Sequence, residues 1–396
     1  MSGEGPGVRG PWTVVHTDFH RGWGGQINRV LGVCRELSAR GHRVILAVPG
    51  EGRPARQARE AGIEVFGEVR FRPAGRVLDL LHDVRALARL FREVRPDVVH
   101  SHGSQDTWAV AIAHRFLPGT PPFVHLLTRH NTKRVRDSLA NRWLYRRGLD
   151  GLAVVAREVL DRYRPLAERG ALDPVAVPVL PSALRPDLRL DPPPDRGALR
   201  RRLGLPPEDR LVGTAARLVP DKGQRYLLGA ATRLLAGPFP RLHVALAGDG
   251  EDREILASTA RALGIGERVH FLGFVEDVAE FLAGLDVAVL PAVGCDASSG
   301  MIKEALVLGV PVVATEIGAA RELLGNGSWG RVVPPGNAEA LAAALAEVLA
   351  DLPAARARAA EGGRVTRETY TVPRLVDGLE EFYAARLAAR RPDQQT

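Results

Sequence analysis

The sequence predicts an α/β protein of the doubly wound class, with two domains that each hold a parallel sheet covered by helices. Short β-branched runs alternate with longer segments of helical periodicity along the whole chain, a pattern typical of parallel sheets packed between helices. The chain has 396 residues, enough for two cores of ordinary size, and 45% of them are hydrophobic. Together these observations predict two soluble, helix-covered sheets.

The first half of the chain contains six predicted strands separated by helices. The strands are predicted at 12–16, 43–48, 63–66, 97–100, 122–127 and 151–155, and two of the helices at 26–39 and 78–93. Residues 175–194 lose periodicity and are rich in proline, which indicates a linker. The alternation resumes with predicted strands at 211–214, 242–247, 268–272, 287–290 and 311–315.

These boundaries predict two domains, residues 1–185 and residues 186–370, facing a central cleft. Residues 371–396 follow the second domain and contain an amphipathic stretch at 375–389. We expect this stretch to form a helix that crosses back to the first domain.

The composition limits the classes of partner. A formal net charge of +8 and a pI of about 10.1 favour anionic partners such as nucleotide phosphates, acidic lipid surfaces or nucleic acid. No apolar run approaches the length of a membrane span, and residues 1–10 lack the apolar core of a signal peptide, so we expect a cytoplasmic protein. The two cysteines, Cys34 and Cys295, have no metal-ligand spacing, and we interpret Cys295 as a packed thiol rather than a nucleophile.

Lysine is rare in this chain. Of its 54 Lys and Arg residues, only Lys133, Lys222 and Lys303 are lysines. Lys carries a compact ammonium and Arg a planar fork, so a lysine in an arginine-rich chain indicates a site that needs a point charge. Lys222 is the strongest candidate.

Charged residues follow the first strand of the second half. In a doubly wound sheet, ligands bind beyond the carboxyl ends of the strands, so residues at these ends are candidates for a site. Arg217 follows the strand and Lys222 opens the next predicted helix, which places two cations where a diphosphate could bind. A surface ion pair of Lys222 with Asp221 or Glu251 is equally consistent with the spacing.

A small-residue loop precedes a later helix. Asp296 is followed by Ser298, Ser299 and Gly300, and Glu304 lies on the helix that begins there. Backbone N–H groups at a helix N-terminus bind phosphate readily, and carboxylates accept hydrogen bonds from sugar hydroxyls. The loop and helix therefore supply the two kinds of group that a sugar nucleotide needs.

Glycines mark two turns at predicted strand ends. Gly24 and Gly25 follow the first strand and allow the backbone to approach a phosphate, although a tight connection is equally consistent. Gly248 follows the strand at 242–247, and here a plain connection is the favoured interpretation for the neighbouring Asp249.

Histidines follow two strands of the first half. His100 and His102 lie at the end of the fourth predicted strand, and Arg129 and His130 after the fifth. A single histidine is more often structural, but three at successive strand ends favour a ligand site at this edge of the sheet.

Taken together, these runs resemble the retaining glycosyltransferases of family 4, which have the GT-B fold. The second half carries the resemblance in residues 216–223 (ARLVPDKG), 246–250 (LAGDG), 269–274 (VHFLGF) and the spaced acids Asp296 and Glu304. The first half agrees in residues 24–25 (GG), 97–102 (DVVHSH) and 128–131 (TRHN). The resemblance covers most of the chain.

The resemblance implies a metal-independent enzyme that takes a sugar from a nucleoside-diphosphate sugar with retention of configuration. It implies that residues 1–185 serve the acceptor side and residues 186–370 bind the donor. Arg217 and Lys222 would hold the diphosphate, and Glu304 would hold the ribose. Asp296 and His130 would lie beside the transferred sugar, which makes the implied catalytic set Asp296, His130, Arg217 and Lys222.

Further residues follow from the same resemblance. The donor site would also include Phe274 near the base, together with Gly24, Gly25, Gly248, Ser298, Ser299, Gly300 and Met301. His102, Arg129 and Lys133 are assigned to the acceptor side. Asp296 stands where the family usually has Glu, which shortens the reach by one methylene and leaves the donor sugar open.

Two other functions remain open from the sequence. One is a sugar-nucleotide 2-epimerase of the same fold, and the other is a non-catalytic protein that binds nucleic acid or membrane through a basic helix predicted at 133–147. We favour a transferase whose acceptor is a cell-envelope glycan such as lipopolysaccharide, or a lipid-linked or phosphorylated molecule, and we expect no nucleic-acid partner. Peripheral contact of the basic helix with an anionic membrane is part of this expectation.

Overall fold

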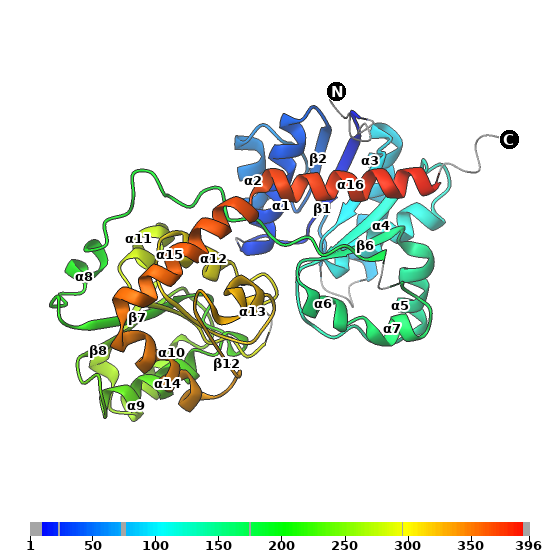
Figure 1. Ribbon diagram of the computed structural model, residues 1–396. Helices are drawn as coiled ribbons and strands as arrows, with labels where there is room; N and C mark the ends of the chain where they lie inside the picture. Colours follow the sequence, from blue (N-terminus) through cyan, green and yellow to red (C-terminus); the bar gives the residue numbers. More distant parts are fainter. Residues whose placement is uncertain (1–9, 23, 73–76, 174–175, 295, 391–396) are drawn as a thin grey trace, which may run out of the picture. The chain divides into compact units, whose positions relative to one another are not determined.

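The computed structural model describes residues 10–22, 24–72, 77–173, 176–294 and 296–390, and it divides into two compact units (Figure 1). Unit 1 combines Met1–Ala183 with Thr371–Thr396, and unit 2 spans Leu184–Tyr370. Each unit has its own sheet and its own core.

Unit 1 contains a six-stranded parallel sheet with the order β3-β2-β1-β4-β5-β6. Its strands are β1 (Thr13–Thr17), β2 (Arg43–Ala47), β3 (Glu64–Phe66), β4 (Val98–Ser101), β5 (Val124–Arg129) and β6 (Gly151–Val154). The chain builds outward from β1 to β3 and then returns to add β4 on the other side of β1. Ligands bind at such a switch point in open α/β sheets, so the carboxyl ends of β1 and β4 are the expected location of a site.

Helices cover both faces of this sheet. The helices α1 (Gly25–Ala39), α2 (Arg53–Glu60) and α16 (Val372–Arg390) pack on one face, and α3 (Val77–Val94) and α4 (Ser104–Phe116) on the other. Val14 and Val15 of β1 point to opposite faces, as the two-residue period of a strand requires. The remaining short helices are α5 (Leu139–Trp143), the π-helix η1 (Leu144–Gly148), α6 (Arg157–Asp161) and α7 (Arg164–Glu168).

The helix α16 follows unit 2 in the chain but packs in unit 1. Figure 1 shows it in red beside α1, and Val376, Leu379 and Tyr383 are buried in the same cluster as the residues of α1. Glu380 of α16 accepts hydrogen bonds from Arg40 and His42, each over 2.8 Å. Unit 1 is therefore built from two separate stretches of the sequence.

Unit 2 repeats the same topology in a second six-stranded parallel sheet, with the order β12-β11-β10-β7-β8-β9. Its strands are β7 (Arg210–Ala215), β8 (Leu242–Ala247), β9 (Val269–Gly273), β10 (Val287–Leu290), β11 (Val312–Thr315) and β12 (Arg331–Val333). The switch point here lies between β7 and β10.

The helices α9 (Gln224–Leu235), α10 (Arg253–Ala262) and α14 (Ala338–Ala350) form a core with one face of this sheet. The helix α12 (Gly300–Val307) packs against β10 and β11 and contacts α11 (Val278–Ala283) and α15 (Leu352–Thr369). Shorter elements of unit 2 are α8 (Ala198–Arg202), η3 (Pro220–Lys222), η4 (Gly266–Arg268), α13 (Ala320–Leu323) and η5 (Gly325–Gly327).

The predicted fold class is confirmed, because both sheets are parallel, six-stranded and doubly wound. The strands predicted at 242–247 and 287–290 have the observed bounds, and the others differ by one or two residues. One strand, β12, was not predicted; it has three residues, too few to show a period. The shifts change the setting of two candidates, since His100 lies inside β4 and Arg129 is the last residue of β5.

The prediction of a basic helix at 133–147 is wrong for the first half of that segment. Residues 130–138 are irregular, and α5 begins only at Leu139, where Ser138 Oγ accepts the N–H of Asn141 over 3.2 Å. Asn131 Oδ1 accepts the N–H of Lys133 over 3.2 Å, a local bond that competes with helix formation. Leu139, the first residue of α5, is 82% exposed.

Within the described ranges, no helix combines the length and the apolar character needed to cross a lipid bilayer.

Candidate active site

The candidate donor site of unit 2 lies where β7 and β10 end, at the switch point of its sheet. Arg217 lies in the turn after β7, and Lys222 ends the 3-10 turn η3, so it precedes α9 rather than opening it as predicted. Lys222 Nζ lies 2.8 Å from Asp296 Oδ2 in the loop after β10, and the two side chains are only 16% and 14% exposed. The structure therefore joins two candidates that are 74 residues apart in sequence.

The two loops that carry this ion pair are tied together through their backbones. Asp221 O accepts the N–H groups of Val293 and Gly294 over 2.9 and 3.1 Å. Gly223 has a φ of +67°, and a Cβ at this position would overlap Pro291 O. The close approach therefore requires glycine, and it fixes the start of α9 against the end of β10.

Asp296 also organises the loop that leads to α12. Its Oδ1 accepts the N–H of Ser299 over 3.0 Å, and Ser299 Oγ donates to Asp296 O over 3.3 Å. Ser299 is buried and has a φ of +44°, so its backbone lies in the left-handed region that few non-glycine residues adopt. One carboxylate thus balances a lysine and holds the N-terminus of a helix.

The helix α12 presents its first residues to this point. Met301 is buried, and its Sδ lies 3.4 Å from the backbone N of Ala215 at the end of β7, so the side chain positions the helix rather than facing a ligand. Glu304 is half-buried one turn further on. Burial raises the pKa of its carboxyl, and the neighbouring Arg185 opposes that rise.

The other donor-site candidates differ in backbone conformation and in exposure to solvent. Gly248 has a φ of +127°, and a Cβ there would overlap Ala216 O, so glycine is needed for the close approach of two turns. Ser298 is half-buried in the loop before α12, and Gly300 is the first residue of that helix. Phe274 follows β9 and is 57% exposed.

In unit 1, the glycines predicted to approach a phosphate begin α1. Gly24 is the N-cap residue in an extended conformation, and a Cβ added at Gly24 or Gly25 would meet no atom within 4 Å. A side chain at either position would therefore begin in open space. Next to them, Asp18 Oδ1 accepts from His20 Nδ1 over 2.6 Å and Asp18 Oδ2 from Gln26 Nε2 over 2.8 Å.

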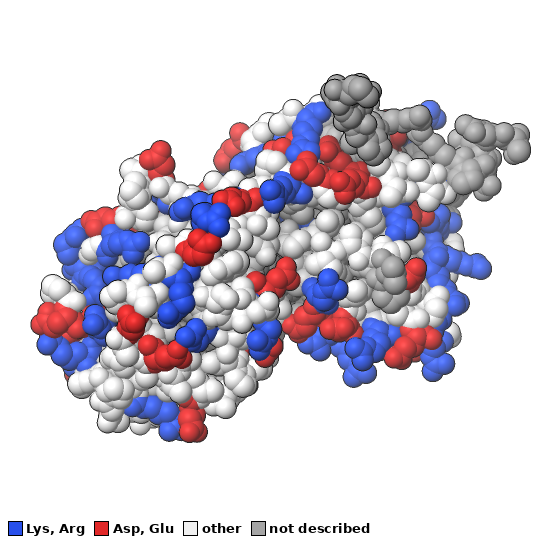
Figure 2. All heavy atoms as spheres, viewed as in Figure 1, with Lys and Arg blue, Asp and Glu red and all other residues white. Residues whose placement is uncertain are grey.

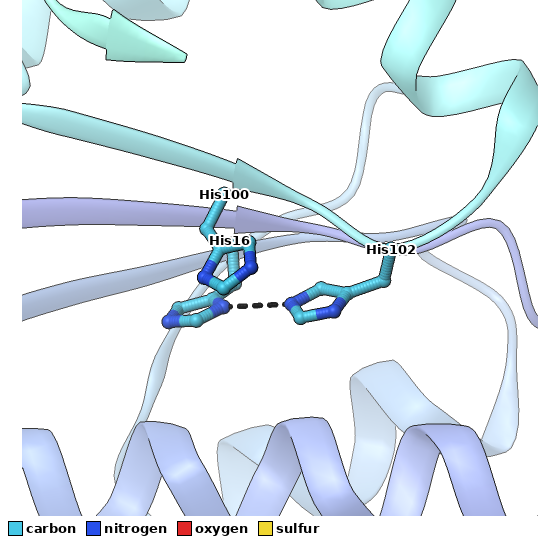
Figure 3. Close-up of side chains that lie close together, drawn as sticks. All are labelled: His16, His100 and His102. Carbon is cyan, nitrogen blue, oxygen red and sulfur yellow. Dashed lines mark hydrogen bonds between the residues drawn. The ribbon is translucent and has the colours of Figure 1, made fainter. Parts of the chain in front are cut away.

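Histidines occupy the switch point of unit 1. Figure 3 shows His16 of β1, His100 of β4 and His102 just beyond β4 gathered together, with a hydrogen bond between His16 and His102. All three side chains are buried. His100 is held at both nitrogens, by Tyr383 Oη over 2.6 Å and by Thr128 Oγ1 over 2.7 Å.

The geometry of these three histidines also raises the question of a metal ion. One nitrogen from each ring lies within 4.8 Å of the others. However, His100 already uses both nitrogens, and so does His102, which bonds to His16 and His130. An ion would have to displace these hydrogen bonds, so the cluster is better described as a hydrogen-bonded network.

The histidines are held neutral by their surroundings. Burial, together with the positive charge of Arg29, lowers the pKa of His16 to about 3. Burial likewise places the pKa values of His100, His102 and His130 well below the usual range. These rings can donate and accept hydrogen bonds, but they do not carry charge at neutral pH.

A buried acid supports the backbone beside them. Asp106 of α4 accepts the N–H of His102 over 2.9 Å and the hydroxyl of Thr17 over 2.8 Å. Burial raises the pKa of Asp106 to about 7. Gln26 Nε2 donates to His102 O over 3.0 Å, so α1 and α4 both fix the position of His102.

A pocket of about 230 Å³, which we call the arginine pocket, opens beside the end of β5 in unit 1. Its lining includes Ser104, Trp108, Arg129, Arg134, Arg136 and Tyr145, and none of the lining residues is acidic. Arg129 donates to Ser104 Oγ over 3.2 Å. In the described part of the chain, Arg134 and Arg136 form no ion pair, whereas Asp137 pairs with Arg142 over 2.6 Å.

The structure brings most of the predicted site residues into two groups, one in each unit. Lys133 is exposed and does not line the arginine pocket. Figure 2 shows acidic and basic side chains mixed over the region of α5 and α7, so this surface is not a single-sign basic face. Cys34 is buried, and Cys295 lies outside the described residues.

The unit 1 network includes residues that were not predicted from the sequence, among them His16, Gln26 and Asp106. His16 is the last residue of the strand predicted at 12–16, but its pairing with His100 of β4 is seen only in the structure. The other two lie on helices, where a single polar residue carries no signal of its own.

The comparisons with known proteins agree with this description. Residues 23–170 match the family model for glycosyltransferase family 4, and residues 195–366 match that for glycosyl transferases group 1. The 2-deoxystreptamine N-acetyl-D-glucosaminyltransferase of Streptomyces fradiae is 29% identical over 356 residues, or 83% of each chain. The D-inositol 3-phosphate glycosyltransferase of Geodermatophilus obscurus is 31% identical over 319 residues, 73% of this chain and 66% of that protein.

Solved structures share the fold. Anabaena HepE in complex with UDP-glucose aligns with a TM-score of 0.79 and 20% identity, covering 94% of this chain and 100% of the other. The lipopolysaccharide outer core galactosyltransferase WaaB aligns with a TM-score of 0.69 and 14% identity, covering 94% of this chain and 99% of the other.

Proposed function

The chain belongs to the glycosyltransferases, with a family 4 domain followed by a group 1 domain, and we propose that it moves a sugar from a nucleoside-diphosphate sugar to an anionic acceptor with retention of configuration. The observation that carries the donor half of this proposal is the grouping of Lys222, Asp296 and the N-terminus of α12 at the switch point of unit 2. It supplies a cation, backbone N–H groups and a carboxylate at one place.

The proposed chemistry follows from the charges that develop during transfer. The anomeric carbon gains positive charge and the departing diphosphate gains negative charge. Arg217, Lys222 and the N–H groups at the start of α12 would stabilise the leaving group, a role that preorganised donors fill without a metal. Asp296 would face the sugar, and the departing phosphate would take the proton of the acceptor hydroxyl.

The acceptor half of the proposal rests on the arginine pocket of unit 1. Related proteins have names that specify different acceptors, including D-inositol 3-phosphate and an aminocyclitol, 2-deoxystreptamine. Three guanidinium groups without an acid in the lining would repel an amine and attract a phosphate. We therefore favour a phosphorylated or lipid-linked acceptor, which includes envelope glycans, and action in the cytoplasm or at the inner membrane face.

A panel of nucleotide sugars tests the function as a whole. The enzyme would be assayed for release of nucleoside diphosphate with phosphorylated sugars, envelope glycan acceptors or an aminocyclitol added one at a time. Acceptor-dependent release is expected. Conversion of a nucleotide sugar to its epimer without net release of diphosphate would instead establish the epimerase alternative, and no reaction with any donor would contradict both.

Glu304→Gln should weaken binding of the free nucleoside diphosphate about tenfold, because a charge-assisted hydrogen bond to the ribose becomes a neutral one. The pKa of Glu304 is raised by burial, so wild-type affinity should also fall as the pH is lowered through that raised value and the carboxylate is protonated. Calorimetry at two pH values measures both effects. Glu339→Gln, at an exposed position on α14, is the matched control, and unchanged affinity in Glu304→Gln would contradict a ribose role.

The double variant Arg134→Ala/Arg136→Ala should raise the KM for a phosphorylated acceptor about tenfold and leave the KM for the donor unchanged, since its phosphate loses two charged partners. Steady-state kinetics with each substrate varied in turn provides the measurement. Arg85→Ala/Arg147→Ala removes the same charge from exposed positions outside the pocket. Equal acceptor KM values for the two double variants would show that the pocket does not bind the acceptor.

A further inference from the structure

Three imidazoles form a continuous hydrogen-bonded chain across the switch point of unit 1. His16 Nδ1 lies 2.9 Å from His102 Nε2, and His102 Nδ1 lies 3.0 Å from His130 Nε2 (Figure 3 shows the first of these bonds). We propose that this chain fixes His130 as the tautomer protonated on Nδ1, so that His130 presents a hydrogen-bond donor and His16 and His102 act as its positioning residues.

The geometry allows only two arrangements of protons. A neutral imidazole has one N–H and one lone pair, so the middle ring, His102, must donate in one of its two bonds and accept in the other. All bonds in the chain therefore run in the same direction. Either His16 donates to His102 and His102 donates to His130, or both bonds are reversed.

The buried end of the chain selects between these directions. His16 Nε2 is buried and has no hydrogen-bond partner among the described residues. If His16 donates through Nδ1, this atom is a bare lone pair; in the reverse direction it is an N–H without an acceptor. Orphaned N–H groups are rarer in protein interiors than under-satisfied acceptors, so the first direction is favoured.

Arg29 adds a buried positive charge to the surroundings of these rings. Its side chain is buried in α1 and donates to Leu180 O over 2.9 Å, and its Nη2 has no partner among the described residues. Its charge acts on His16, His102 and His130, and in each case it lowers the pKa.

The surrounding residues keep the rings in place. The ring of His100 stacks on that of His102, with centroids 4.5 Å apart and an angle of 25° between planes, and His100 is itself bonded at both nitrogens. The backbone of His102 is held by Asp106 and Gln26. Neither acid of this region, Asp18 or Asp106, bonds to a ring of the chain in the described structure; Asp18 pairs with His20 instead.

The proposed tautomer has a consequence for the reaction, and this part rests on the proposed function. His130 would offer an N–H to an oxygen of the transferred sugar, and it could not also serve as a base through the same nitrogen. The proton of the acceptor hydroxyl must then be taken by another group, which agrees with transfer of that proton to the departing phosphate.

The test is nitrogen NMR of the whole enzyme labelled with ¹⁵N-histidine. Two-bond proton–nitrogen correlations distinguish a protonated ring nitrogen from a bare one, and the substitutions His16→Leu, His102→Leu and His130→Leu assign three of the 11 histidines. At neutral pH we expect His16, His102 and His130 each to carry the proton on Nδ1. Protonation of His130 on Nε2, a mixture of both tautomers, or a charged imidazolium would overturn the proposal.

Variants of His16 add a functional measurement. His16→Leu should release the tautomer of His130 and lower kcat about tenfold, the effect of one lost hydrogen bond, without raising the donor KM. His16→Asn places an amide N–H near the former Nδ1. Its kcat should therefore lie within about threefold of the wild-type value. Equal activity of the Leu and Asn variants would contradict the proposal; if either variant fails to fold, the wild-type spectrum still decides.

Two further outcomes separate the inferences. The expected tautomers in an enzyme without transferase activity would contradict the proposed function alone. Stoichiometric binding of zinc by the wild type that is lost in His16→Leu would overturn the hydrogen-bonded chain, because ligation consumes the lone pairs on which it depends.

Discussion

Lys222→Ala is expected to lower the rate of sugar transfer about 100- to 1000-fold, which is the usual effect of removing one preorganised donor from a developing negative charge. The structure strengthens this expectation. The Lys222 side chain is 16% exposed and lies against Asp296, so the variant would also leave a largely buried carboxylate without its cation beside the diphosphate. Affinity for the donor should fall with the rate, by a factor that corresponds to about 1.5 to 3 kcal/mol.

Release of nucleoside diphosphate measures the rate, and calorimetry with the free nucleotide measures the affinity. Lys222→Arg should recover little activity, because a planar guanidinium cannot replace a compact ammonium in this space. The double variant Lys222→Ala/Asp296→Asn tests the origin of the effect: it should bind nucleotide better than Lys222→Ala, since the uncompensated charge is gone. Wild-type turnover by Lys222→Ala, with an unchanged melting temperature, would contradict the assignment.

Asp296→Ala should lower transfer by about tenfold or more while free nucleoside diphosphate binds nearly as before, the pattern of an interaction made to the reacting sugar. Asp296 accepts from Lys222 and from the N–H of Ser299, and neither bond requires the nucleotide. Loss of the carboxylate would remove one partner of Lys222 and leave its charge at the site. Asp296→Ala is therefore expected to lower transfer with nearly unchanged nucleotide affinity, whereas Glu304→Gln is expected to lower the nucleotide affinity itself.

Asp296→Asn separates the two roles of this side chain. Its amide oxygen can still accept the N–H of Ser299 and hold the loop, but it no longer balances the positive charge at the anomeric carbon. We expect Asn to resemble Ala in transfer and the wild type in thermal stability. If Asp296→Ala and Glu304→Gln lose equal affinity for the free nucleotide, the two acids act as one unit and the division of their roles is wrong.

The fold could be predicted from local patterns because parallel strands are short, buried and β-branched. The predicted strands at 242–247 and 287–290 match the structure, and each is buried along its whole length. The helix predicted at 133–147 was wrong in its first half because local hydrogen bonds outweigh the pattern there. Its composition favours a helix, but the side chains of Asn131 and Ser138 bond to nearby backbone groups, and such bonds depend on geometry that hydrophobic periodicity does not report.

Sequence patterns indicated which residues to consider for the site, but not how they pair. Spacing along the chain placed Lys222 near Asp221, whereas the partner observed in the structure is Asp296, brought in by the pairing of β7 with β10. His16 was missed because a single buried histidine inside a strand looks like any other core position. Only the register between β1 and β4 shows that it meets His100.

The division of unit 1 into two stretches affects the order in which the protein can fold during synthesis. Domains usually fold one after another as they leave the ribosome, starting from the N-terminus. Here the whole of unit 2 emerges before α16, and α16 supplies Leu379 and Tyr383 to the core of unit 1. Unit 2 can therefore reach its native state first. The sheet of unit 1 and the ring of His100 gain their contacts with α16 only after α16 has been synthesised.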